Sequence, residues 1–146
     1  MLKRYSFWLW VVVALQILTA AAHSLSFIVT PVAANPTERQ LLDLMANYQS
    51  DMGAGIHRSM SQLFTALSAC FPLLYLLGAL NNFYLLKKLV EPGLVKGFLA
   101  IQLVVFGITF GLMAALTFLP PIVATGLVFT FLAVAFFMTP KVQPGS

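Results

Sequence analysis

Long uncharged stretches dominate the pattern of hydrophobic and polar positions along the chain. No charged residue occurs between Tyr5 and Thr37, between Ser59 and Leu86, or between Gly97 and Pro140. A helix needs roughly 20 apolar residues to cross about 30 Å of hydrocarbon. The first two stretches each hold one such helix, and Pro120-Pro121 divide the third into two. The pattern predicts four transmembrane helices, at about residues 7–29, 59–80, 97–118 and 121–138.

The loop between the first two predicted spans has a different, amphipathic pattern. Thr37 and Gln40 fit a capping box, in which their side chains satisfy free backbone N–H groups reciprocally. Gly53 and Gly55 then supply a helix C-cap and a turn. We expect a helix over about residues 38–50 that lies on the outer surface, packed on the bundle or in the headgroup layer. Its apolar side consists of Leu41, Leu42, Met45, Tyr48 and Met52.

These elements predict an all-α integral membrane protein. The expected fold is one membrane domain over residues 1–146, a four-transmembrane-helix bundle with one amphipathic helix in the first extracytoplasmic loop and a disordered tail at 140–146. The chain is 60% hydrophobic and only 8% charged, whereas roughly a quarter of a soluble domain is charged. We also expect the polar faces of the first and second spans to meet, because neither can face lipid cheaply.

The net charge of +4 is distributed asymmetrically. Arg39 and Arg58 lie on one side of the predicted membrane, together with three acidic residues. Six basic residues flank the ends on the other side, which predicts cytoplasmic termini. The predicted partner is therefore the lipid bilayer, with attraction to anionic lipid heads as a secondary role, and no nucleic acid. The six basic residues are Lys3, Arg4, Lys87, Lys88, Lys96 and Lys141.

A polar stripe marks one face of the first span. Its members step by three and four residues, and the membrane-depth histidine among them must face protein or water. His57 lies at the mouth of the second span. One hypothesis is structural, with hydrogen bonds to neighbouring helices. Another is an outward-opening polar pocket around His23. The candidate lining residues are Gln16, Thr19, His23, Ser26, His57, Gln62 and Thr65.

A third hypothesis is metal or haem ligation by His23 and His57, because neutral imidazole binds zinc, copper and haem iron. The two histidines lie at different depths and have no accompanying Cys or Met motif, so we expect no cofactor. No Asp or Glu lies within a predicted span, which disfavours a proton-coupled drug exporter. The chain also has no Gly-rich phosphate loop, nucleophile elbow, paired carboxylates or CxxC motif. From these absences we expect no catalytic residues and no enzymatic activity.

Four short motifs carry a resemblance to a known group of proteins. They are Ala22-His23-Ser24, Pro36-Thr37-Glu38, Leu41-Leu42-x-x-Met45 and His57-Arg58-Ser59. Over roughly residues 15–80 the chain resembles small bacterial four-helix membrane proteins without an assigned activity. The resemblance implies a bacterial inner-membrane protein and carries no catalytic residues across.

Three functional hypotheses follow from these patterns. The leading one is a non-enzymatic accessory or partner-binding subunit, which binds other membrane proteins or a second copy of itself. The alternative is a small-molecule transporter or ligand-binding membrane protein that uses the pocket around His23. The third is a haem- or quinone-linked membrane anchor.

Overall fold

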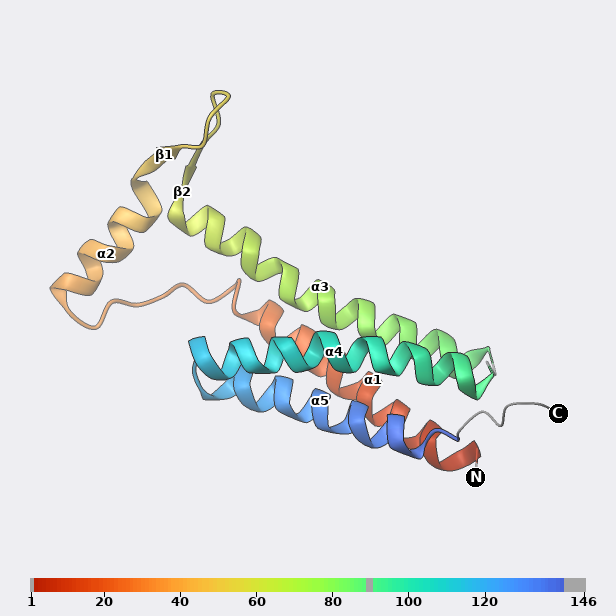
Figure 1. Ribbon diagram of the computed structural model, residues 1–146. Helices are drawn as coiled ribbons and strands as arrows, with labels where there is room; N and C mark the ends of the chain where they lie inside the picture. Colours follow the sequence, from red (N-terminus) through yellow and green to blue (C-terminus); the bar gives the residue numbers. More distant parts are fainter. Residues whose placement is uncertain (1, 89–90, 141–146) are drawn as a thin grey trace. The chain divides into compact units, whose positions relative to one another are not determined.

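The computed structural model describes residues 2–88 and 91–140. In this part of the chain, five helices and one two-stranded antiparallel sheet follow one another (Figure 1). Four of the helices are long and apolar enough to cross a membrane, which confirms the predicted set of long apolar helices. The elements are α1 (Leu2–Leu25), α2 (Pro36–Asn47), β1 (Gln49–Asp51), β2 (His57–Ser59), α3 (Met60–Lys87), α4 (Pro92–Leu116) and α5 (Leu119–Met138).

The chain divides into two compact units. Unit 1 consists of Met1–Thr19 and Tyr75–Ser146, and unit 2 of Ala20–Leu74. Helices α1 and α3 each contribute one part to each unit. The two units are described separately below.

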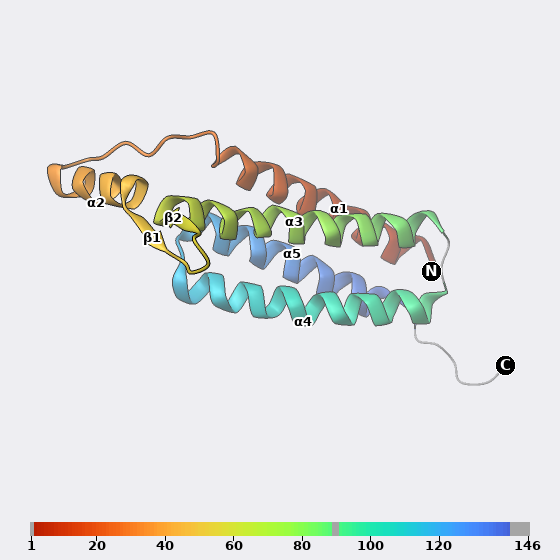
Figure 2. The ribbon, with the colours of Figure 1, turned by 90° about the horizontal axis from the view of Figure 1, so that it is seen from above.

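Four helical segments lie side by side in unit 1: the first part of α1, the second part of α3, α4 and α5 (Figure 2). Their buried positions recur at steps of three and four residues, as packing along one helix face requires. On α4 these are Val95, Leu99, Gln102, Phe106 and Thr109, and on α5 Thr125, Val128, Leu132 and Ala135. Leu9 and Val12 of α1 complete the apolar core.

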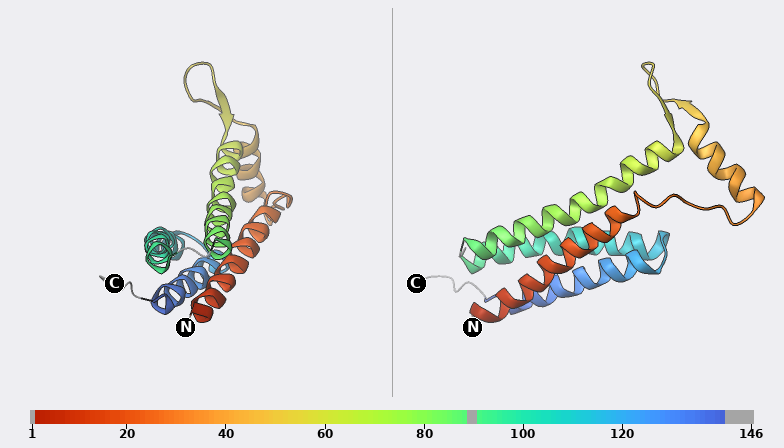
Figure 3. Two further views of the ribbon diagram at one scale, coloured as in Figure 1. Left: turned by 90° about the vertical axis from the view of Figure 1, so that its right-hand side faces the viewer. Right: turned by 180° about the vertical axis from the view of Figure 1, so that it is seen from behind.

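Helices α4 and α5 form an antiparallel hairpin held by two reciprocal contacts (Figure 3). A Cβ added at Gly107 would lie 3.1 Å from the Phe129 ring, and one at Gly126 would lie 3.0 Å from the Phe110 ring. The two rings stack with centroids 6.2 Å apart and planes at 11°. Each glycine therefore makes room for a phenylalanine of the other helix, the close approach that small residues allow in membrane bundles.

The long helices differ in their bounds from the predicted spans. Helix α1 ends at Leu25 rather than near residue 29, because Ser26, Phe27 and Ile28 donate to carbonyls three residues back and tighten the chain into turns. Helix α3 continues past residue 80 to Lys87. The outer turn before α5 lies at residues 117–118, and Pro120-Pro121 belong to the first turn of α5, where a missing N–H costs nothing.

In unit 2, helix α2 begins two residues before the predicted start. Its N-cap is Asn35, whose side chain accepts a hydrogen bond from the Glu38 N–H at 2.9 Å. The Glu38 carboxylate accepts in turn from the Ala34 N–H at 2.6 Å. The capping box predicted at Thr37 and Gln40 is therefore wrong: Pro36 takes the first helical position, which its fixed φ favours, and asparagine precedes it as the cap.

The two glycines after α2 belong to a β-hairpin rather than to a helix C-cap. Strands β1 and β2 pair antiparallel, with Asp51 opposite His57. Gly53 and Gly55 have φ of 87° and 77° in the connecting turn, and Ala54 has φ of 51°. Such left-handed conformations suit glycine, which has no Cβ. The predicted C-cap is wrong because α2 ends at Asn47, before these glycines. Of the predicted tail at 140–146, only residue 140 lies within the described residues.

Candidate functional site

The polar centre of unit 1 is a cluster of three side-chain amides, which we call the amide cluster: Gln16 of α1, Asn82 of α3 and Gln102 of α4. Gln16 and Asn82 are 0% exposed and Gln102 is 8% exposed. Asn82 Nδ2 donates to Gln16 Oε1 at 3.1 Å and to Gln102 Oε1 at 2.9 Å. Gln102 Nε2 donates to Asn82 Oδ1 at 2.8 Å, and Gln16 Nε2 donates to Gln102 Oε1 at 3.3 Å. Three helices thus meet through one uncharged hydrogen-bonded group.

Gly78 allows the Gln16 side chain to approach α3 closely. A Cβ at Gly78 would lie 2.5 Å from Gln16 Nε2 and 3.2 Å from Gln16 Cδ. The amide of Gln16 therefore lies directly over the α3 backbone, one helical turn from Asn82. Tyr75, Gly78 and Asn82 recur at steps of three and four and share one buried face of α3.

The chemistry open to the amide cluster is limited. Each amide offers two N–H donors and one carbonyl acceptor, and none of them ionises or acts as a nucleophile. In a membrane bundle, a hydrogen bond between helices contributes on average about 0.6 kcal/mol and at most about 1.7 kcal/mol. The arrangement therefore joins α1, α3 and α4 through hydrogen bonds between their side chains.

The histidine of the predicted stripe has a separate environment in unit 2. His23 Nε2 lies 3.2 Å from the backbone carbonyl oxygen of Ser68 on α3. Pro72 lies inside α3, four residues after Ser68, and has no N–H to give to that carbonyl. A carbonyl only accepts, so His23 Nε2 carries the proton in this contact. The His23 ring also contacts Phe27 and Phe71, with centroids 5.7 Å away in each case.

Three of the remaining predicted pocket residues, Gln62, Thr65 and Ser26, form hydrogen bonds to near neighbours along the chain. Gln62 and Ser59 form a capping box at the start of α3, where Ser59 N–H donates to Gln62 Oε1 at 3.0 Å and Gln62 N–H to Ser59 Oγ at 3.3 Å. Thr65 Oγ1 donates to the Ser61 carbonyl and Ser26 Oγ to the His23 carbonyl, both within one helical turn. Thr19 is half-buried on α1.

The two histidines differ in exposure and belong to different elements of secondary structure. His57 is exposed on strand β2, whereas His23 is half-buried on α1. Within residues 2–88 and 91–140, no group of three or more His, Cys, Asp or Glu side chains lies close enough to hold a metal ion.

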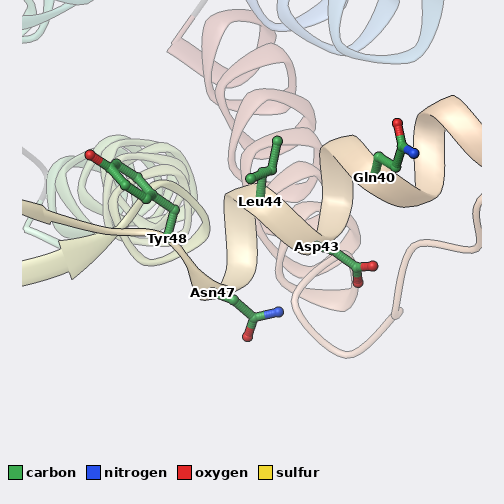
Figure 4. A pocket seen from close by; sticks show the side chains of 5 residues that line it. All are labelled: Gln40, Asp43, Leu44, Asn47 and Tyr48. Carbon is green, nitrogen blue, oxygen red and sulfur yellow. The ribbon is translucent and has the colours of Figure 1, made fainter.

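A shallow pocket lies along α2 in unit 2. It is lined by Gln40, Asp43, Leu44, Asn47 and Tyr48. Figure 4 shows the first four side chains projecting from α2 and Tyr48 just beyond the end of the helix. Leu44 and Tyr48 are 64% and 67% exposed, and none of the residues of α2 is buried. Leu42 and Met45 of the predicted apolar side are half-buried, whereas Leu41 is exposed, so part of the apolar surface of α2 is uncovered within unit 2.

Asn82 and Gln102 are the two cluster members that the sequence pattern did not mark as site residues. Asn82 lies just beyond the predicted end of the second span at residue 80. The signal that marks it is its spacing: Asn82 continues the three-and-four steps from Tyr75 and Gly78 along α3. Comparison of the chain with known protein families, curated proteins and solved structures gives no match.

Proposed function

We propose that this chain is a non-enzymatic integral membrane protein that acts as an accessory or partner-binding subunit, and that its outer segment is the binding surface. The outer segment is defined as residues 26–58, between α1 and α3. The observation that carries the proposal is α2, an amphipathic helix without a buried residue. Its Leu41 and Leu44 are exposed, and so is Tyr48 just beyond its end.

Support also comes from the connection that leads to α2. Ile28, Val29 and Val32 are 79%, 71% and 89% exposed. A row of large apolar side chains is costly in water, and contiguous exposed apolar surface is typical of sites that contact another protein or a membrane. The polar groups of the amide cluster, in contrast, already bond one another, which favours a structural bundle over one with an open binding centre.

The proposal includes an orientation in the membrane. Six basic residues flank the side that holds both chain ends, against two on the side of the outer segment, so we propose cytoplasmic termini in a bacterial inner membrane. The bound partner is then another membrane protein, or a second copy of this chain, whose extracytoplasmic surface contacts α2.

Site-specific photo-crosslinking in native membranes tests the proposal. A photoreactive phenylalanine analogue at Leu44 or Tyr48 is expected to give one discrete protein adduct, the same from both positions. Arg39 is the matched control, since it lies nine residues, about two and a half turns, from Tyr48 and so on the other side of the helix.

The results separate the alternatives. An adduct of twice the chain mass identifies a second copy, and an adduct of another mass identifies a different protein. Both support the proposal if the Arg39 position gives none. Adducts to lipid alone, or equal yields from all three positions, would overturn it.

A further inference from the structure

One end of unit 1 carries nearly all of its charge. The start of α1, the end of α3, the start of α4 and the end of α5 come together there (Figure 2, Figure 3). The described cationic side chains at this end are Arg4, Lys87, Lys88 and Lys96. Glu91 is the only acidic residue in the sequence of unit 1. The end is therefore strongly and uniformly basic.

Aromatic rings hold three of these lysines in place. Lys87 Nζ lies 5.5 Å from the centroid of the Phe83 ring, and Lys88 Nζ lies 6.0 Å from that of Tyr84. Lys96 Nζ of α4 lies 5.0 Å from the ring centroid of Phe136 on α5. These distances are within the range of cation–π attraction. The three ammonium groups therefore lie beside aromatic rings at this end of unit 1.

The aromatic layer continues onto α1. Trp10 meets Phe83 edge to face with centroids 5.7 Å apart, and Trp8 stacks on Phe131 of α5 at 5.6 Å. Trp and Tyr rings favour the boundary between hydrocarbon and headgroups. Lysines held against such a layer lie at the depth of lipid phosphate groups, where each contributes roughly fivefold to the binding of an anionic surface.

We propose that this end of unit 1, the basic–aromatic end, is a binding surface for the headgroups of anionic phospholipids. The surface is defined by Lys87, Lys88 and Lys96 with the rings of Phe83 and Tyr84. The inference rests on the membrane insertion contained in the proposed function, but it does not depend on a partner at the outer segment. Charge complementarity selects the occupant, because Glu91 alone opposes the cations.

Fluorescence quenching by brominated lipid tests this surface directly. Trp8 and Trp10 are the only tryptophans in the sequence, and both belong to the first part of α1. The purified full-length chain is reconstituted into mixtures of phosphatidylcholine and phosphatidylglycerol in which one or the other carries brominated acyl chains. We expect anionic lipid to bind beside the tryptophans several-fold more strongly than zwitterionic lipid, and high salt to reduce this preference.

Matched variants assign the effect to the lysines. The triple variant Lys87→Gln, Lys88→Gln, Lys96→Gln is expected to lose the preference, with a relative binding constant near one. The double variant Arg39→Gln, Arg58→Gln removes the two arginines of unit 2 and is expected to keep the preference. If the triple variant does not fold, Lys88→Gln alone is expected to reduce the preference, since Lys88 is exposed just beyond the end of α3.

The outcomes distinguish this inference from the proposed function. Equal quenching by the two lipids in the unmodified chain, or a preference that the lysine variants retain, would overturn the anionic-lipid surface while leaving insertion intact. Absence of quenching by either brominated lipid would overturn insertion itself, and with it both proposals.

Discussion

The amide cluster of unit 1 and the His23 contact of unit 2 are two different solutions to the same problem, a polar side chain on an otherwise apolar helix. In the amide cluster, three side chains from three helices satisfy one another. At His23, one side chain satisfies a backbone carbonyl that Pro72 leaves without its usual donor.

The two arrangements differ in the hydrogen-bonding groups that a substitution would leave without a partner. Removal of one amide leaves buried partners without hydrogen bonds, which costs more than the bond itself contributed. Removal of His23 leaves a single half-buried carbonyl, which water or a nearby hydroxyl can satisfy more easily. The amide cluster should therefore dominate stability, and the following predictions test that order.

The largest effect is expected for Asn82→Ala. The substitution removes three of the four hydrogen bonds of the amide cluster and leaves Gln16 and Gln102 buried with one bond at 3.3 Å. We expect a loss of about 2–4 kcal/mol in the free energy of unfolding. Unfolding by SDS in mixed micelles, followed by circular dichroism, measures it. Asn81→Ala is the matched control on the neighbouring, half-buried position; equal losses from the two variants would refute the assignment.

Gly78→Ala is expected to have the next largest effect. Its methyl group would meet the Gln16 amide at 2.5 Å, and that amide can move only by giving up its hydrogen bonds. We expect a loss of about 1–3 kcal/mol in the same assay. Gly111→Ala, which meets nothing within 4 Å, should be neutral or slightly stabilising. In a Gln16→Ala background, Gly78→Ala should cost little stability. If the loss persists, the added methyl group clashes with a residue other than Gln16.

A smaller effect is expected at His23. His23→Ala should lower the free energy of unfolding by about 1 kcal/mol, since one hydrogen bond to the Ser68 carbonyl is lost. Pro72→Ala returns an N–H to that carbonyl, so His23→Ala should cost less in this background. The double-mutant cycle measures the coupling. Additive effects of the two substitutions would show that the contribution of His23 to stability does not depend on Pro72.

The smallest effect is expected for Tyr75→Phe. The Tyr75 hydroxyl is buried and has no hydrogen-bond partner among the described residues, while its ring meets Phe106 edge to face at 5.2 Å. Loss of an unpaired hydroxyl should leave stability unchanged or raise it by about 1 kcal/mol. A clear loss would instead show that the hydroxyl has a bound partner, and the amide cluster would then extend towards a bound water or ligand.

Much of the fold follows from the sequence because it depends on local patterns. Uncharged stretches mark the long apolar helices, and the apolar side of residues 41–48 marks α2. The positions of the helix ends were predicted less accurately than the helices themselves. Asn35, rather than Thr37, caps α2 because Pro36 suits the first helical position. The extension of α3 to Lys87 depends on Asn82, which finds partners on two other helices.

For the candidate site, too, the sequence predicted some features and missed others. We expected polar positions of the first two spans to face each other. His23 does contact the second span, at the Ser68 carbonyl, whereas Gln16 bonds Asn82, which lies beyond the predicted end of that span. The seven proposed pocket residues, however, have several separate environments. Gln62 forms a helix cap, and the structure joins Gln16 instead to Asn82 and Gln102.

The sequence by itself determined four long apolar helices, one amphipathic helix and an asymmetric distribution of basic residues, since each of these is a property of neighbours along the chain. Only the tertiary structure decided that Gln16, Asn82 and Gln102 bond one another and that His23 bonds the Ser68 carbonyl. The physical reason is that helical periodicity defines a face within one helix. It does not define the register between helices, and hydrogen bonds over about 3 Å depend on that register.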